Sequence, residues 1–168
     1  MEVRLAICLL IACCLATTAS AAGIKPDALK SALQQRGTLS ARLETLLAKP
    51  LSEEQAKPLS EAEKSHARAM ENLRRQYVEQ VAQVTGLPAA KLRPILLRSD
   101  NTARKLEKGV IPDMEKLLGR QLSAADVGQV RSARETLLAK TRSQQEAFAR
   151  QVAGIAKIPQ HVALALTR

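Results

Sequence analysis

The sequence predicts an all-α fold, a helical bundle built from two tandem related units that each contain a short, a long and a short helix. Leu, Ala and Val supply most of the apolar residues, with one Tyr, one Phe and no Trp. These residues do not alternate over a long run, as they would in a half-buried strand. They recur instead every three, four or seven positions, which is typical of amphipathic helices.

A repeat in the chain supports the division into two units. Residues 39–97 align without a gap on residues 110–168, a shift of 71 positions (110 − 39), and ten positions are identical. The most informative stretches are residues 77–88 and 148–159, each of which ends a predicted long helix and begins a short one. The clustering of the identities favours a duplication over chance. Two copies are fewer than an open solenoid needs, so we expect a closed bundle.

Residues 1–21 are expected to be a signal peptide. Arg4 precedes an apolar run of 12 residues, 5–16, which is too short to span a bilayer. Ala19-Ser20-Ala21 fits the small-x-small rule for cleavage before Ala22. The sequence therefore predicts a periplasmic or secreted protein.

An alternative processing site lies inside the same segment. Residues 10–13, Leu-Ile-Ala-Cys, resemble the lipobox of bacterial lipoproteins, in which Cys13 would be acylated. The other cysteines, Cys8 and Cys14, also lie before residue 22. Cleavage before Ala22 would leave a mature protein without a disulfide or a thiolate site, stabilised by helix packing alone.

Residues 22–168 are expected to form a single all-helical domain. Pro26 should open a short helix that Gly37 closes, and a second helix over residues 40–49 should stop at Pro50. Ser52 and Gln55 form a capping box. Because Pro58 follows, we expect the first long helix to settle only at residues 60–63, a second capping box. Gly86 should end it, and a short helix should run over residues 88–97.

The second copy is expected to follow a hinge at residues 99–101. A short helix over residues 112–118 should end at Gly119. Ser123 and Asp126 should cap the second long helix, and a last helix should cover residues 159–167. The expected buried stripes are Ala62, Ala69, Leu73, Tyr77, Val81 and Val84 in one long helix and Val127, Val130, Ala133, Leu137, Phe148, Val152 and Ile155 in the other.

The sequence shows no motif for a catalytic, metal or cofactor site. His66 falls on the apolar stripe and is expected to be a buried or partly buried structural residue, whereas His161 is expected at the surface. No second His or Cys stands at helical spacing from His66, so we expect no bound metal. Phosphate-loop and hydrolase motifs are absent, so no cofactor and no enzyme activity are expected. An enzyme would need a pocket that joins one of these histidines to a carboxylate.

The positive charge suggests a binding surface. The net charge is +10, and a basic surface attracts anions. The candidate residues for an anion-binding or partner-binding face are Lys64, Arg68, Arg74, Arg75, Arg131, Arg134, Lys140, Arg142 and Arg150. The alternative is that these charges only keep the protein soluble. Because the two aromatic residues lie on the apolar stripes, no platform for stacking bases is expected, and nucleic acid is not an expected partner.

Two short motifs carry a family resemblance. The motifs are Leu51-Ser52-x-x-Gln55 and Leu122-Ser123-x-x-Asp126. They resemble the paired Leu-Thr-x-x-Gln motifs of small periplasmic helical proteins of the Spy/CpxP type. This chain has Ser in place of Thr in both motifs and Asp in place of Gln in the second. The resemblance implies an exported, basic protein of long helices that acts as an ATP-independent chaperone or envelope-stress modulator and forms a homodimer.

The sequence therefore leads to two functional hypotheses. The first is a non-enzymatic periplasmic protein that binds other proteins through helix faces, like a chaperone or stress modulator. The second is a basic secreted or surface protein that binds anionic envelope polymers or lipid head groups.

Overall fold

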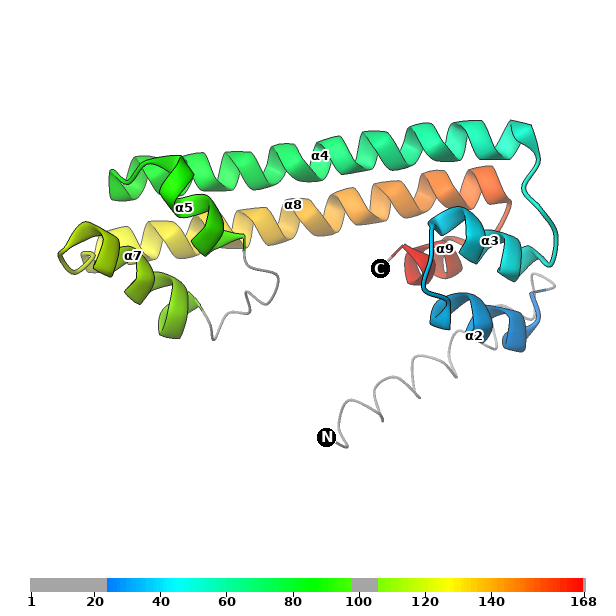
Figure 1. Cartoon of the computed structure of the whole chain (residues 1–168), viewed down its shortest axis with the longest axis horizontal. Helices are drawn as coiled ribbons and strands as arrows, with labels where there is room; N and C mark the ends of the chain where they lie inside the picture. The colour runs from blue at the N-terminus through cyan, green and yellow to red at the C-terminus, as the bar shows by residue number, and fades with distance from the viewer. Residues whose placement is uncertain (1–23, 98–105, 168) are drawn as a thin grey trace. The chain divides into compact units, whose positions relative to one another are not determined.

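The computed structural model of the protein describes residues 24–97 and 106–167 (Figure 1). Helices take up 82% of these residues and no strand occurs among them, which confirms the all-α class. The predicted signal peptide, the cleavage or lipidation site and the hinge at residues 99–101 lie outside the described residues. In chain order the elements are α2 (Pro26–Gln34), α3 (Leu39–Leu47), α4 (Glu53–Thr85), α5 (Ala89–Leu96), the π-helical turn η1 (Leu106–Val110), α7 (Ile111–Leu118), α8 (Ala124–Ala156) and α9 (Gln160–Leu166).

Both long helices begin at the predicted capping boxes. The Ser52 backbone N–H donates to Gln55 Oε1 at 3.3 Å, and the Ser123 N–H donates to Asp126 Oδ2 at 3.3 Å. The Asp126 N–H donates in return to Ser123 Oγ at 3.1 Å. These bonds satisfy N–H groups that have no partner inside a helix. The cap at Ser123 and Asp126 is therefore confirmed with both of its bonds. At Ser52 only the bond to the Gln55 side chain forms, because the Gln55 N–H donates to the Ser52 carbonyl at 2.9 Å.

The expected interruption at Pro58 is wrong, because α4 is continuous from Glu53 and contains this proline. Proline lacks the N–H that would bond to the carbonyl of Glu54, but Glu54 and Pro58 are both exposed to solvent, where water can serve that carbonyl. The next residue, Leu59, is fully buried and holds the helix against the core. Residues 60–63 are consequently an internal part of the helix.

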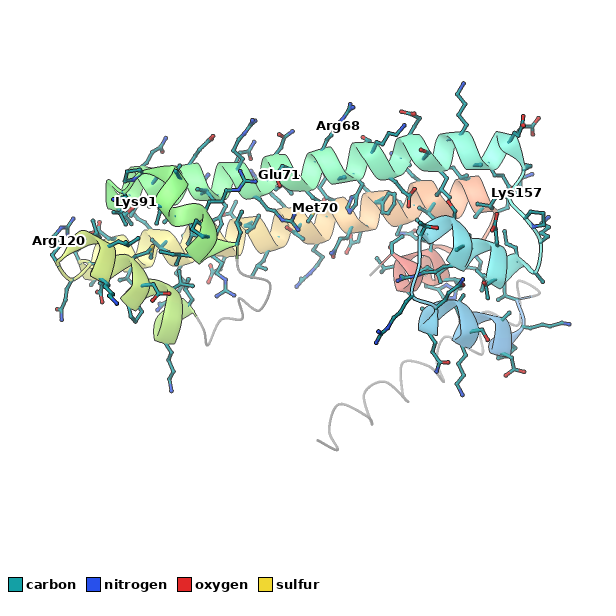
Figure 2. All side chains as sticks on the ribbon, in the orientation of Figure 1. Arg68, Met70, Glu71, Lys91, Arg120 and Lys157 are labelled. Atoms are coloured by element: carbon teal, nitrogen blue, oxygen red, sulfur yellow. The ribbon has the colours of Figure 1, made fainter. Side chains whose placement is uncertain are left out.

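Four residues with positive φ end helices or follow them. Gly86 has φ +71° and Gly119 has φ +66°, as expected for C-terminal glycines. Ala48 (φ 52°) follows α3 and Lys157 (φ 56°) follows α8. Lys157 stands in the turn that leads to α9 (Figure 2). In the alignment of the two sequence copies, Ala48 stands opposite Gly119 and Gly86 stands opposite Lys157.

The chain divides into two compact units. Unit 1 holds the described residues up to Ala67 together with those from Gln144, and unit 2 holds those from Arg68 to Ser143. Helices α4 and α8 each contribute one part to unit 1 and another part to unit 2. Each compact unit therefore combines segments from both sequence copies, and the expected single domain over residues 22–168 stays a prediction.

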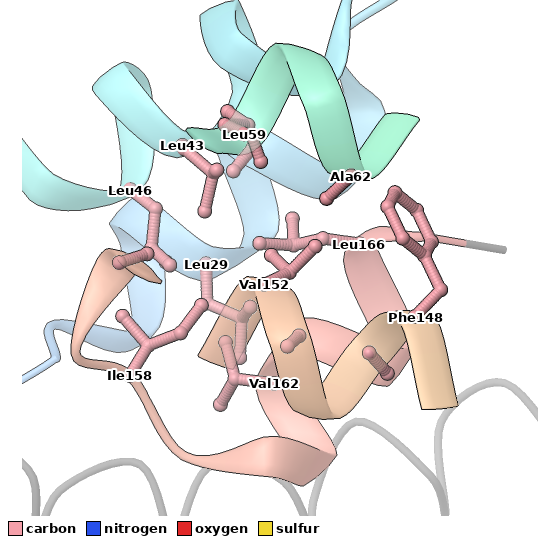
Figure 3. Packing of buried hydrophobic residues seen from close by; sticks show 14 residues of the cluster. Leu29, Leu43, Leu46, Leu59, Ala62, Phe148, Val152, Ile158, Val162 and Leu166 are labelled. Carbon is pink, nitrogen blue, oxygen red and sulfur yellow. The ribbon is translucent and has the colours of Figure 1, made fainter. Parts of the chain in front are cut away.

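The core of unit 1 joins α2, α3 and α9 to the first turns of α4 and the last turns of α8. Its buried side chains point toward one another in Figure 3. Phe148 is 7% exposed and lies on α8, as predicted for the apolar stripe. The buried members of this core are Leu29, Ala32, Leu43, Leu46, Leu59, Ala62, Phe148, Ala149, Val152, Ala156, Ile158, Val162, Ala163 and Leu166.

The core of unit 2 joins α5, η1 and α7 to the last turns of α4 and the first turns of α8. Tyr77 is 3% exposed and helical, so both predicted aromatic core positions are confirmed. The buried members are Tyr77, Val78, Val81, Leu87, Leu92, Leu96, Leu106, Val110, Ile111, Met114, Leu122 and Val130.

Many structural features recur at the 71-residue spacing. Helices α4 and α8 have bounds that differ by 71 positions at both ends (124 − 53 and 156 − 85). Glu44 Oε1 accepts a hydrogen bond from the Leu51 N–H, as Glu115 Oε1 does from the Leu122 N–H. Fully buried residues also correspond, namely Leu43 with Met114, Leu59 with Val130, Val81 with Val152 and Leu92 with Ala163. The duplication itself stays a prediction.

Replacing Ala48 or Lys157 by glycine is expected to stabilise the protein. Left-handed backbone costs a residue with a Cβ about 1 kcal/mol, and glycine avoids most of this strain. Each substitution should therefore raise the free energy of unfolding by up to about 1 kcal/mol in urea denaturation.

Gly86→Ala and Gly119→Ala are the reverse controls. No atom lies within 4 Å of a Cβ built at either glycine, so a loss of stability would report the backbone alone. A gain of stability in these two variants, or a loss in Ala48→Gly and Lys157→Gly, would contradict the assigned backbone.

Candidate functional site

An open groove lies between the first turns of α4 and the last turns of α8, within unit 1. It has a volume of about 490 Å³ and is lined by Pro58, Glu61, Ala62, Ser65, Arg150, Gln151, Gly154 and Ile155. Half of these residues have a short side chain or none, which leaves parts of the helix backbones open to a partner. Because residue 58 is proline, the Glu54 carbonyl also lacks its usual helical donor at this end of α4.

The charged residues of the groove differ in their pairing. Glu61 accepts from Lys64 Nζ at 3.2 Å. In the part of the chain that the structure describes, no carboxylate lies within ion-pair distance of Arg150. The groove therefore has an apolar floor with Arg150 as its uncompensated charge.

A second cavity in unit 1 surrounds His66. It has a volume of about 290 Å³ and is lined by Gly37, Leu39, Arg42, Glu63, His66, Phe148, Leu166 and Thr167. The imidazole of His66 stacks on the ring of Phe148, with 4.4 Å between the ring centroids and 8° between the planes. The half-buried, structural His66 that the sequence predicts is confirmed.

Burial determines the ionisation of His66. Desolvation lowers the pKa of this imidazole from its ordinary value of 6.5. Its Nδ1 atom is buried and has no hydrogen-bond partner among the described residues. The charged groups that face the cavity are Arg42 from α3 and Glu63 from α4.

The cavity places His66 near a carboxylate, which is the arrangement that an enzyme would need. No hydrogen bond within the described residues joins Glu63 to His66, however, and the buried Nδ1 is unpartnered. A carboxylate that orients a catalytic imidazole bonds to one of its nitrogens. The two side chains therefore share a cavity without a hydrogen bond between them.

Arg42 has a structural role at the rim of this cavity. Its Nε donates to the Gln35 carbonyl at 3.2 Å, and its Nη1 donates to the Leu166 carbonyl at 3.0 Å. Both carbonyls lie at helix ends, where a positive charge is favourable. Arg42 thus ties α3 to the ends of α2 and α9.

The nine basic candidates are distributed over both units. Lys64 and Arg150 belong to unit 1, and the other seven belong to unit 2. Eight of the nine are exposed, and Arg68 extends from α4 in Figure 2. Four are paired with acidic residues, namely Lys64 with Glu61, Arg74 with Glu71, Arg75 with Glu79 and Arg131 with Glu107.

Arg134 is the exception, and its assignment to an exposed face is wrong. It is only 7% exposed. Val130, Arg134 and Leu137 are spaced by four and three residues, so Arg134 lies on the apolar stripe of α8. This spacing was visible in the sequence. His161, which was expected at the surface, is half-buried.

Tyr77 is a second buried polar group with an unusual environment. Burial raises the pKa of its hydroxyl from 10.0, while the positive charge of Arg134 acts in the opposite direction. The hydroxyl is buried and has no hydrogen-bond partner among the described residues. A buried hydroxyl without a partner costs stability.

Tyr77→Phe is expected to raise the free energy of unfolding by about 1 kcal/mol, because it removes an unsatisfied buried hydroxyl. The aligned position carries Phe148, which is also buried. Urea denaturation would measure the change. A loss of about 1 kcal/mol or more would show that the hydroxyl makes a stabilising bond in solution.

Lowering the pH through 6.5 is expected to destabilise the wild type relative to His66→Leu. The pKa of His66 is lowered in the folded protein, so the unfolded chain binds a proton first as the pH falls. The stability that depends on neutral His66 is fully present above pH 6.5 and is lost between 6.5 and the folded pKa. Leucine is the chosen replacement because Leu137 occupies the aligned position.

Urea denaturation of both proteins at about pH 8 and about pH 5 would measure this difference. The stability of the wild type should fall further than that of His66→Leu. An equal fall in the two proteins would contradict the assigned environment of His66.

Comparison of the chain with protein-family models, with curated proteins and with solved structures found no match. Among the described residues, no group of three or more His, Cys, Asp or Glu side chains is placed to hold a metal ion. Within the same residues, every helix is too short or too polar to cross a membrane.

Proposed function

We propose that this protein is a non-enzymatic, exported binder of other polypeptides that acts as a chaperone or envelope-stress modulator. The groove of unit 1 is the observation that carries the proposal. It is open, about 490 Å³ in volume, and lies between two helices that are held in place by a buried core.

The groove is chemically suited to a polypeptide segment. Pro58, Ala62 and Gly154 offer little side-chain bulk, so a partner can approach the helix backbones closely. Ile155 adds an apolar contact, and Ser65 and Gln151 offer hydrogen bonds without strict sequence selection. Arg150 favours partners that carry an acidic residue beside their apolar side chains. A surface of this kind accepts many apolar segments rather than one specific ligand.

The resemblance to proteins of the Spy/CpxP type also supports the proposal. In this chain Ser52, Gln55, Ser123 and Asp126 cap the two long helices. Gln55 Nε2 also donates to the Ile155 carbonyl at 3.1 Å, which fixes the start of α4 against the end of α8. The motif residues therefore stabilise the helices that line the groove, and binding is left to other residues.

Binding of anionic envelope polymers or lipid head groups is the second candidate. It is supported by Arg68, Lys140, Arg142 and Arg150, which are exposed and have no acidic partner within ion-pair distance in the described ranges. The other four exposed basic residues are paired with glutamates, which weakens the case for anion binding. Salt-sensitive retention on lipopolysaccharide or heparin, without any effect on protein aggregation, would favour this candidate.

Filling the groove is expected to weaken polypeptide binding. In Gly154→Leu a branched side chain would occupy the floor of the groove and exclude a partner side chain. A loss of about 1 kcal/mol of binding would raise the amount of protein needed to slow aggregation of an unfolded client about fivefold. Light scattering of the client at stoichiometric amounts of purified protein would measure this.

Gly128→Leu is the matched control. Gly128 is also an exposed residue of α8, and no atom lies within 4 Å of a Cβ built at either glycine. Both substitutions raise helix propensity to the same extent, but Gly128 does not line the groove. An equal loss in both variants would assign the effect to another surface, and a wild type that does not slow aggregation would reject the proposed function.

A further inference from the structure

Neither half of the chain has a core of its own. The first half is residues 24–97 and the second half is residues 106–167, joined through residues 98–105. Of the fourteen buried residues in the core of unit 1, six come from the first half and eight from the second. Of the twelve in the core of unit 2, six come from each half. Both buried clusters of the described residues are therefore interfaces between the two halves.

The short helices show the same arrangement. Helix α3 contacts α9 in unit 1, and α5 contacts α7 in unit 2. Each of these contacts joins a helix of the first half to a helix of the second. Helices α3 and α5, which belong to the same half, lie in different units. Contacts between α2 and α3 and between η1 and α7 lie within one half. The first half on its own would nevertheless lose the eight buried residues that the second half supplies to the core of unit 1 and the six that it supplies to the core of unit 2.

We propose that a second copy of this chain is a binding partner, through exchange of halves. In the resulting dimer, the first half of each copy completes both cores with the second half of the other copy. All the side-chain contacts inside each unit are kept, and only the covalent connection between halves changes. Such exchange is a low-cost route to a dimer. The proposal does not depend on the proposed function.

Concentration decides between the two forms. The second half of the same chain competes with the second half of another copy for pairing with the first half. A short linker gives the half of the same chain an effective concentration on the order of mM. Refolding at about this concentration should produce dimers, and refolding at about a thousandth of it should produce monomers. A dimer once formed should persist on dilution, because release requires both cores to open.

Complementation between two full-length variants tests the proposal. Leu59→Asp and Val152→Asp each put a charge at a fully buried position of the unit 1 core, the first in the first half and the second in the second half. Each variant alone should lose helical signal. Refolded together at high concentration, the two variants can form a dimer by exchange of halves. In one pair of halves both are wild type, and in the other pair both carry the aspartate.

The expected result is a mixed dimer that regains about half of the lost helical circular dichroism, with the mass confirmed by light scattering. Mixing the two variants without unfolding them together should give less of this species. No regained signal, with or without a mixed species, would overturn the proposal, since dimers formed through outer surfaces cannot repair a core. A wild type that stays monomeric after refolding at about 1 mM would also overturn it.

Discussion

The burial of the apolar stripes on α4 and α8 is the constraint on which the rest of the structure depends. Aromatic side chains are scarce, and the three cysteines all precede residue 15, so packing of aliphatic side chains provides most of the stability. Neither long helix can cover its stripe by itself. The short helices supply the missing apolar surface, α2, α3 and α9 in unit 1 and α5, η1 and α7 in unit 2. The groove and the His66 cavity are surface features of this packing.

The all-α class and the capping boxes could be predicted because they depend on local sequence. Spacing of apolar residues places Tyr77 and Phe148 on buried faces, and a Ser with Gln or Asp three residues later marks a helix start. The continuity of α4 through Pro58 could not be predicted from local rules. It depends on the burial of Leu59 against helices that are distant in the sequence.

The candidate site was less predictable than the fold. A count of basic residues selected nine positions, but it could not show that Glu107 of another element pairs with Arg131. The groove was not predicted because it depends on small residues on two helices. A small residue has no catalytic or ligand-binding group, so a sequence pattern of functional groups does not include it. Arg134 differs, since its place on the apolar stripe could have been read from the spacing.

Residues at positions 71 apart give the two units different properties. Arg42 and Glu63 in unit 1 align with Asp113 and Arg134 in unit 2, so the two charges are exchanged. His66 aligns with Leu137, which gives unit 1 a titratable group on an aromatic ring where unit 2 has an aliphatic side chain. Unit 1 also carries Ala48 and Lys157 at left-handed positions where unit 2 has glycine.

Native-state hydrogen exchange in Met114→Ala tests most directly whether the two halves share their cores. Met114 and Leu92 are both fully buried in unit 2, one from each half. A cavity at Met114 should cost about 2–5 kcal/mol. We expect the backbone amides of α5 to lose protection together with those of α7. Loss of protection in η1 and α7, with α5 unchanged, would contradict a core built from both halves.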